Sequence, residues 1–108
     1  MTGKIVTVTV DRPKGSTHPK HKNIVYPINY GYISGIIAGD GEEQDAYIIG
    51  IGHAVDKFTG RVVAVIHRID DNEDKWVVAP DGKSFTAEQI KAATDFQEKY
   101  FKTEIILL

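Results

Sequence analysis

The chain has 108 residues, of which 42% are hydrophobic and 26% are charged, and its formal net charge is −2. This is the composition of one ordinary globular domain, which we expect to span residues 1–108. The slight negative charge excludes a nucleic-acid binder that works by bulk charge, and the lack of cysteine excludes disulfides and thiolate metal sites. No signal peptide and no membrane-length apolar run are recognisable, so we expect a cytoplasmic protein without nucleic-acid or membrane partners.

Short strands dominate the predicted secondary structure. Alternating Val and Thr, or runs of β-branched residues, mark the half-buried strands, and Pro27 and Gly31 make the tyrosine-rich one an irregular or edge strand. The predicted strands cover residues 5–10, 24–33, 46–51, 61–69 and 76–79. Loops are expected at residues 14–23, 53–60 and 80–85.

One helix is expected near the C-terminus. Thr86 and Gln89 fit a capping box, with the hydroxyl at the N-cap and the amide three residues on. Apolar spacing extends the predicted helix to about residue 102, and residues 103–108 form either a last strand or an apolar tail. About five strands and one helix in so short a chain predict a mainly β fold, a small closed barrel.

Two acidic turns carry the most suggestive chemistry. The first, Asp40-Gly-Glu42-Glu43-Gln-Asp45, places four carboxylates within six residues just before an apolar strand. Turns favour Asp and Gly in any case, so a solvated surface turn is the plain alternative. The second turn, residues 70–75, joins the two strands of a hairpin and has the same alternative.

If both turns meet at one end of the barrel, their carboxylates need a cation to offset their mutual repulsion. Two or more Mg²⁺ ions would do this, with Mn²⁺ as the alternative, and would activate a bound water. The basic loop at residues 14–23 and the strand tyrosines would suit a phosphate ligand, although a solvated loop and core packing explain them too.

The spacing of these motifs resembles the family I soluble inorganic pyrophosphatases. Tyr26-Pro-Ile-Asn-Tyr30-Gly-Tyr-Ile is similar to the family's YPxNYG(Y/F), and Asp40 follows Tyr30 at the family's spacing to D-G-D-P-x-D. The resemblance continues through the second acidic turn and the C-terminal helix. It implies a barrel of the OB-like type and Mg²⁺-dependent hydrolysis of pyrophosphate to two phosphates.

The same resemblance implies roles for individual residues. Glu42, Tyr30 and Lys20 take catalytic positions, with Glu42 orienting or deprotonating the metal-bound water. The implied metal ligands are Asp40, Glu42, Asp45, Asp70 and Glu73, with Asp74 as an alternative to Glu73. The implied phosphate-binding residues are Lys20, Tyr26, Tyr30, Lys75, Tyr100 and Lys102. Under this interpretation Glu42→Gln abolishes turnover.

Several departures from the family pattern bear on activity. Glu42 stands where the family has Asp, the hairpin that carries a phosphate-binding arginine before Tyr26 is missing, and the chain is shorter than usual. Arg12 or Lys22 are candidates to replace that arginine. Alternatives to a diphosphatase are therefore a non-catalytic module that binds metal, phosphate or nucleotide, a hydrolase for another phosphoanhydride, and a purely structural barrel. A homo-oligomer is compatible with the resemblance.

Overall fold

The structure is a computed structural model that describes residues 3–108. Its elements in chain order are β1 (Ile5–Arg12), β2 (Asn29–Ile37), β3 (Glu43–Ile48), β4 (Lys57–Arg68), β5 (Glu73–Ala79), α1 (Ala87–Glu98) and β6 (Thr103–Leu107). The fold is mainly β with one helix, as predicted, and the C-terminal segment is a strand. Among the residues described, no helix combines the length and apolar character needed to cross a membrane.

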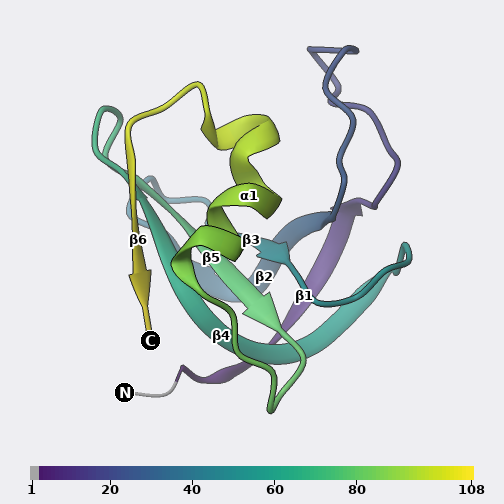
Figure 1. Ribbon diagram of the computed structural model, residues 1–108, viewed down its shortest axis with the longest axis vertical. Coiled ribbons are helices and arrows are strands. Elements are labelled where there is room, and N and C mark those ends of the chain that lie inside the picture. Colours follow the sequence, from purple (N-terminus) through teal and green to yellow (C-terminus); the bar gives the residue numbers. More distant parts are fainter. Residues whose placement is uncertain (1–2) are drawn as a thin grey trace.

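The strands close into a barrel. They are hydrogen-bonded in the order β1-β2-β3-β5-β4, and β1 also pairs with β4, so that the sheet returns to its first strand (Figure 1). All pairs are antiparallel except β3 and β5, which run parallel, and β6 adds to β4 outside the barrel. Closure removes the exposed edges that a sheet of five short strands would otherwise present. The predicted small barrel is confirmed.

The apolar core has two parts, and strand β4 contributes to both. Inside the barrel, Val62 packs with residues such as Val8 and Ile48, whereas Ala64 and Ile66 pack on the side that faces α1. A register shift between Val62 and Ala64 breaks the strict alternation of side chains along β4. The irregularity lets one strand supply two cores.

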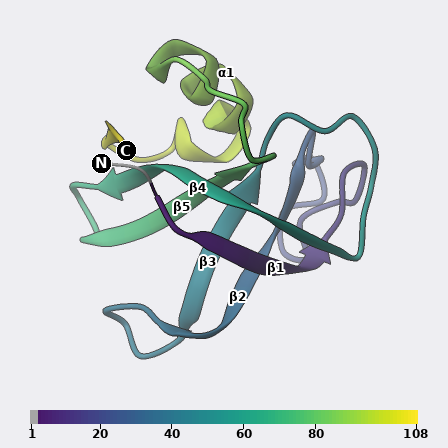
Figure 2. The ribbon, with the colours of Figure 1, turned by 90° about the horizontal axis from the view of Figure 1, so that it is seen from below.

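Helix α1 begins where the sequence predicts and ends earlier. The Thr86 side chain accepts from the backbone N–H of Gln89, and the Gln89 side chain accepts from the backbone of Thr86, which confirms the capping box. The predicted end near residue 102 is wrong. The helix stops at Glu98, because the chain must turn back for β6 to pair with β4. Figure 2 shows α1 on one side of the barrel and the β2–β3 hairpin extending on the other.

Several strands begin or end at residues other than those predicted. Strand β2 starts only at Asn29, and the residues before it form a loop with one isolated bridge, Thr17–Val25, because Pro27 has no amide to donate. The predicted loop at 53–60 is shorter than expected, since residues 57–60 already pair with β1. Strand β3 starts at Glu43, so half of the first acidic motif lies in a strand rather than a turn.

Candidate anion-binding pocket

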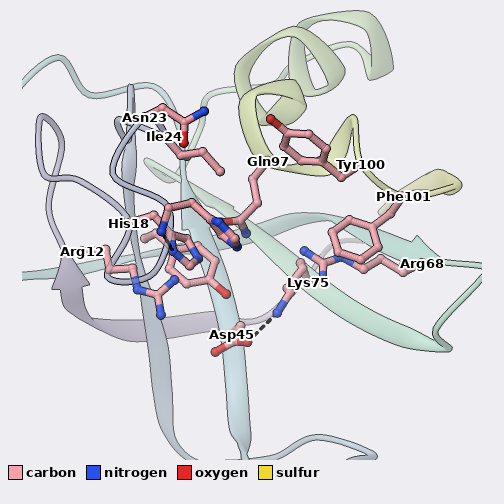
Figure 3. Close-up of a pocket in the computed structure, with 12 residues that line it drawn as sticks. Arg12, His18, Asn23, Ile24, Asp45, Arg68, Lys75, Gln97, Tyr100 and Phe101 are labelled. Carbon is pink, nitrogen blue, oxygen red and sulfur yellow. Dashed lines mark hydrogen bonds and ion pairs between the residues drawn. The ribbon is translucent and has the colours of Figure 1, made fainter.

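A polar pocket of about 500 Å³ opens between the barrel, the loop after β1 and the C-terminal end of α1. In Figure 3 the Arg12 and His18 side chains enter it from one side and Arg68 and Lys75 from the other. The residues that line it are Arg12, His18, His21, Asn23, Ile24, Tyr30, Asp45, Arg68, Lys75, Gln97, Tyr100 and Phe101. Cationic and aromatic side chains outnumber acids in this lining.

Lys75 lines the pocket and is buried. Because β3 and β5 run parallel with Ala46 opposite Trp76, Lys75 and Asp45 are neighbours, and Lys75 Nζ donates to Asp45 Oδ2 at 2.6 Å. Glu73 lies two residues before Lys75 on the same face of β5, and its Oε1 accepts from Lys75 Nζ at 2.6 Å. Burial lowers the pKa of Lys75, but nearby Tyr30 and the two carboxylates outweigh it, so the pKa is raised overall. Lys75 therefore stays protonated and positively charged at neutral pH.

Tyr30 contributes a neutral phenol next to that ammonium. Only 5% of the residue is exposed, and the Lys75 Nζ atom lies 5.8 Å from the centroid of its ring. Burial raises the pKa of Tyr30, an effect that Lys75 partly opposes and Asp45 reinforces. The hydroxyl of Tyr30 thus stays protonated at neutral pH and is able to donate a hydrogen bond to an anion.

Arg68 forms the second wall of the pocket through a buried ion pair with the helix. Its Nε and Nη2 donate to Oε1 and Oε2 of Glu98 at 2.8 and 2.7 Å, a two-point contact between a guanidinium and a carboxylate. The Arg68 guanidinium carbon also lies 3.8 Å from the centroid of the Phe101 ring. Burial lowers the pKa of Arg68, but the hydrogen bonds and charge of Glu98 outweigh this effect, so the pKa is raised overall. This pair ties β4 to the end of α1.

A chain of hydrogen bonds connects the two arginines behind the pocket. Arg12 Nη1 donates to the Tyr26 hydroxyl at 2.6 Å, which donates to Gln97 Oε1 at 2.9 Å. Gln97 Nε2 then donates to the Tyr47 hydroxyl at 2.9 Å, and that hydroxyl donates to Glu98 Oε2 at 2.6 Å. Burial raises the pKa of both tyrosines, so both remain protonated donors. The last turn of α1 thereby orients groups on opposite walls of the pocket.

The first acidic turn does not enter this pocket. Asp40 and Glu42 are exposed at the tip of the β2–β3 hairpin, where Asp40 Oδ1 accepts from the backbone N–H of Glu42 at 3.0 Å. Only Asp45, already in strand β3, reaches the pocket. The Asp40 side chain thus finds its hydrogen-bond partner within the turn, and the start of strand β3 separates the tip of the turn from Asp45.

The second acidic turn also disperses its side chains. Asp74 is hydrogen-bonded to His67, Asp70 accepts from the backbone of Lys102, and Glu73 is paired with Lys75. The parallel pairing of β3 and β5 does place both turns at the same end of neighbouring strands, as expected. The expected gathering of their carboxylates does not occur: within residues 3–108, no three His, Asp or Glu side chains are close enough to hold one metal ion.

The expected phosphate ligands are divided in the same way. Tyr30, Lys75 and Tyr100 line the pocket, whereas Lys20 and Lys102 are exposed and do not. Tyr26 is fully buried behind it, with its hydroxyl committed to Arg12 and Gln97.

Two pocket cations were missed as site residues by the sequence interpretation. The sequence indicates Arg12 only as a candidate to replace a missing arginine, and Arg68 only as part of a strand. A signal for Arg68 was present, because Ala64 and Ile66 alternate with less apolar or more exposed positions, and Arg68 continues the same alternation. An arginine at an inward position needs a buried partner, which turned out to be Glu98.

Comparisons with known proteins agree with this fold. The family model for inorganic pyrophosphatase matches residues 4–105. The structure is similar to an inorganic pyrophosphatase from Ehrlichia chaffeensis, with a TM-score of 0.72 and 20% identity, covering 94% of this chain and 83% of that one. For an inorganic pyrophosphatase from Neisseria gonorrhoeae the TM-score is 0.65 and the identity 24%, over 91% and 74% of the two chains. No curated protein matches in sequence.

Proposed function

The chain belongs to the inorganic pyrophosphatase family, and from this premise we propose that it binds inorganic pyrophosphate in the Lys75 pocket and hydrolyses it to two phosphates. The observation that carries the proposal is the lining of the pocket. Arg12, Lys75 and the neutral hydroxyl donor of Tyr30 face one cavity, and phosphate oxygens are acceptors for all three.

We assign roles from position in the pocket. Lys75 and Arg12 bind phosphoryl oxygens and offset their charge, and Tyr30 donates to one of them. Hydrolysis of a phosphoanhydride depends mainly on positioning and on charge neutralisation, which these groups supply. Tyr100, whose side chain is exposed at the rim, is placed to contact the outer phosphoryl group.

Asp45 is the carboxylate best placed to act on the attacking water. Its side chain is 35% exposed, lines the pocket and pairs with Lys75. An anion bound to Lys75 competes for that ammonium and frees the carboxylate. Asp45 then accepts a proton from water while the water oxygen bonds to phosphorus, and the bond from phosphorus to the bridging oxygen breaks to release phosphate.

The family resemblance predicts Mg²⁺, with two or more ions, and the donor set of this chain does not fit such a cluster. Mg²⁺ is usually held by one or two carboxylates and keeps several waters in octahedral geometry, so the carboxylates that hold it must be free of competing cations. The two acids that flank Lys75, Asp45 and Glu73, are both held by its ammonium at 2.6 Å, and no third joins them among the residues described. Dependence on Mg²⁺ or Mn²⁺ thus stays a prediction, and no step above relies on it.

The same ion pairs favour a second candidate function, a non-catalytic module that binds phosphate, pyrophosphate or the phosphates of a nucleotide. Cations engage Asp45 in the pocket and the carboxylates of Glu73 and Glu98 beside it, so the site is well equipped to hold an anion. This candidate keeps the binding roles of Arg12 and Lys75 and removes only the role of Asp45.

One experiment separates the two functions. Purified protein is mixed with pyrophosphate with and without Mg²⁺, and phosphate release and binding heat are both recorded. Turnover that Asp45→Asn removes supports the hydrolase. Binding without turnover supports the module, and the absence of both contradicts the proposed function and leaves a structural barrel. Replacing pyrophosphate by a nucleoside triphosphate tests the other phosphoanhydrides.

A further inference from the structure

Arg12 differs from Arg68 and Lys75 in forming no ion pair with any of the residues that the structure describes. Arg68 is paired with Glu98 and Lys75 with two carboxylates, but none of the ion pairs formed within residues 3–108 includes Arg12. Its side chain donates one hydrogen bond, to Tyr26. A guanidinium carries five N–H donors, so Arg12 has donors to offer to a ligand.

The position of Arg12 is nevertheless well defined. Its guanidinium carbon lies 5.7 Å from the ring centroid of Tyr26 and 5.5 Å from that of Tyr30, and the Tyr26 hydroxyl that it binds is held in turn by Gln97. Burial lowers the pKa of Arg12, but the hydrogen bond to Tyr26, the neighbouring phenols and the charge of Asp11 raise it overall. A cation that is already oriented loses less freedom when it binds an anion.

The loop after β1 brings two imidazole rings to the same side of the pocket. The His18 ring stacks on Tyr26 with 6.3 Å between centroids and 9° between planes, and His21 lies next to it. Slight burial lowers the pKa of His18, and Arg12, His21 and Lys20 lower it further. The charge of Arg12, which repels a proton from His18, also attracts an anion to this side of the pocket.

We infer that the pocket recognises pyrophosphate as a metal-free anion, with Arg12 as its main contact and Lys75 as the second. The inference rests on the proposed function and specifies how the substrate is held. Two points support it: among residues 3–108 the acids and histidines form no divalent-metal cluster, and the oriented guanidinium of Arg12 takes part in none of the ion pairs found there. Side-chain cations thereby take over the charge neutralisation that bound metal ions would otherwise provide.

The test is calorimetric titration of the full chain with pyrophosphate in EDTA, repeated with excess Mg²⁺. Wild type, Arg12→Gln, Arg12→Lys and the matched control Arg61→Gln are compared; Arg61 lies outside the pocket, paired with Asp81. We expect binding in EDTA, a loss of about 10- to 100-fold in affinity for Arg12→Gln, and no change for the control. Arg12→Lys should fall between, because it keeps the charge but not the planar donor fork. Thermal melts show that each variant is folded.

Three results would overturn the inference. Binding that appears only with Mg²⁺ contradicts metal-free recognition, and turnover under the same conditions leaves the proposed function intact. Binding in EDTA that Arg12→Gln leaves unchanged contradicts the assignment of Arg12. Neither binding nor turnover in any condition contradicts the inference and the proposed function together.

Discussion

Replacing Arg68 by methionine is the sharpest test of how the pocket is held together. Glu98 has a side chain only 4% exposed, and two of its hydrogen bonds come from Arg68, with a third from Tyr47. Methionine fills similar space but leaves this carboxylate buried without its counter-ion. Breaking a buried pair from one side costs about 3–5 kcal/mol, much of which is the desolvation of the charge left behind.

That loss is large for a chain of this size. The free energy of unfolding of a domain is about 5–15 kcal/mol. Each kcal/mol of lost stability lowers the melting temperature of a small domain by about 4–8 °C. We therefore expect Arg68→Met to melt about 12–40 °C below wild type in a thermal scan, with a matching shift in the urea midpoint. Lys91→Met, which breaks the exposed pair with Asp95, serves as control and should cost only about 0.3–0.5 kcal/mol.

The double variant Arg68→Met/Glu98→Gln shows whether the uncompensated charge is the cause. It removes both charges, so it should be more stable than Arg68→Met alone. The reasoning would be refuted if Arg68→Met stayed within about 1 kcal/mol of wild type, or if the second substitution brought no recovery.

Three further predictions follow from the site and its surroundings. Lys75→Met leaves Asp45 and Glu73 without their shared ammonium, so pyrophosphate binding should weaken at least about tenfold in calorimetry; unchanged binding would exclude Lys75 as a ligand. Asp45→Asn should reduce phosphate release at least about a hundredfold, whereas Glu42→Gln, at the exposed hairpin tip, should leave phosphate release unchanged. The opposite ranking of the two variants would show that the acidic turn reaches the substrate. The hydrogen bond to Asp74 raises the pKa of His67 above its usual value of about 6.5. The contribution of this pair to stability is therefore complete below that pH and is lost as the pH rises through the raised pKa. An NMR titration in which Asp74→Asn failed to lower the pKa of His67 would contradict the pairing.

Local chemistry was sufficient to predict most of the fold. The capping box of Thr86 and Gln89 fixes the start of α1 because its partners are three residues apart, and alternating side chains identify strands because alternation is a property of one segment. The number of short strands then favours closure, since a small sheet has no other way to remove its edges. The motif around Tyr30 was enough to predict the inorganic pyrophosphatase family, whose family model matches residues 4–105.

The composition of the site was decided only by tertiary structure. Tyr47 meets Glu98 across 51 residues of sequence, and Lys75 meets Asp45 across 30, so neither pair has a local signature. The acidic turn shows the same limit: its spacing predicts a carboxylate cluster, but the β2–β3 hairpin carries Asp40 and Glu42 to its tip and leaves Asp45 beside an ammonium. Sequence determines which charges a chain has, whereas the packing of strands and helix determines which of them face one another.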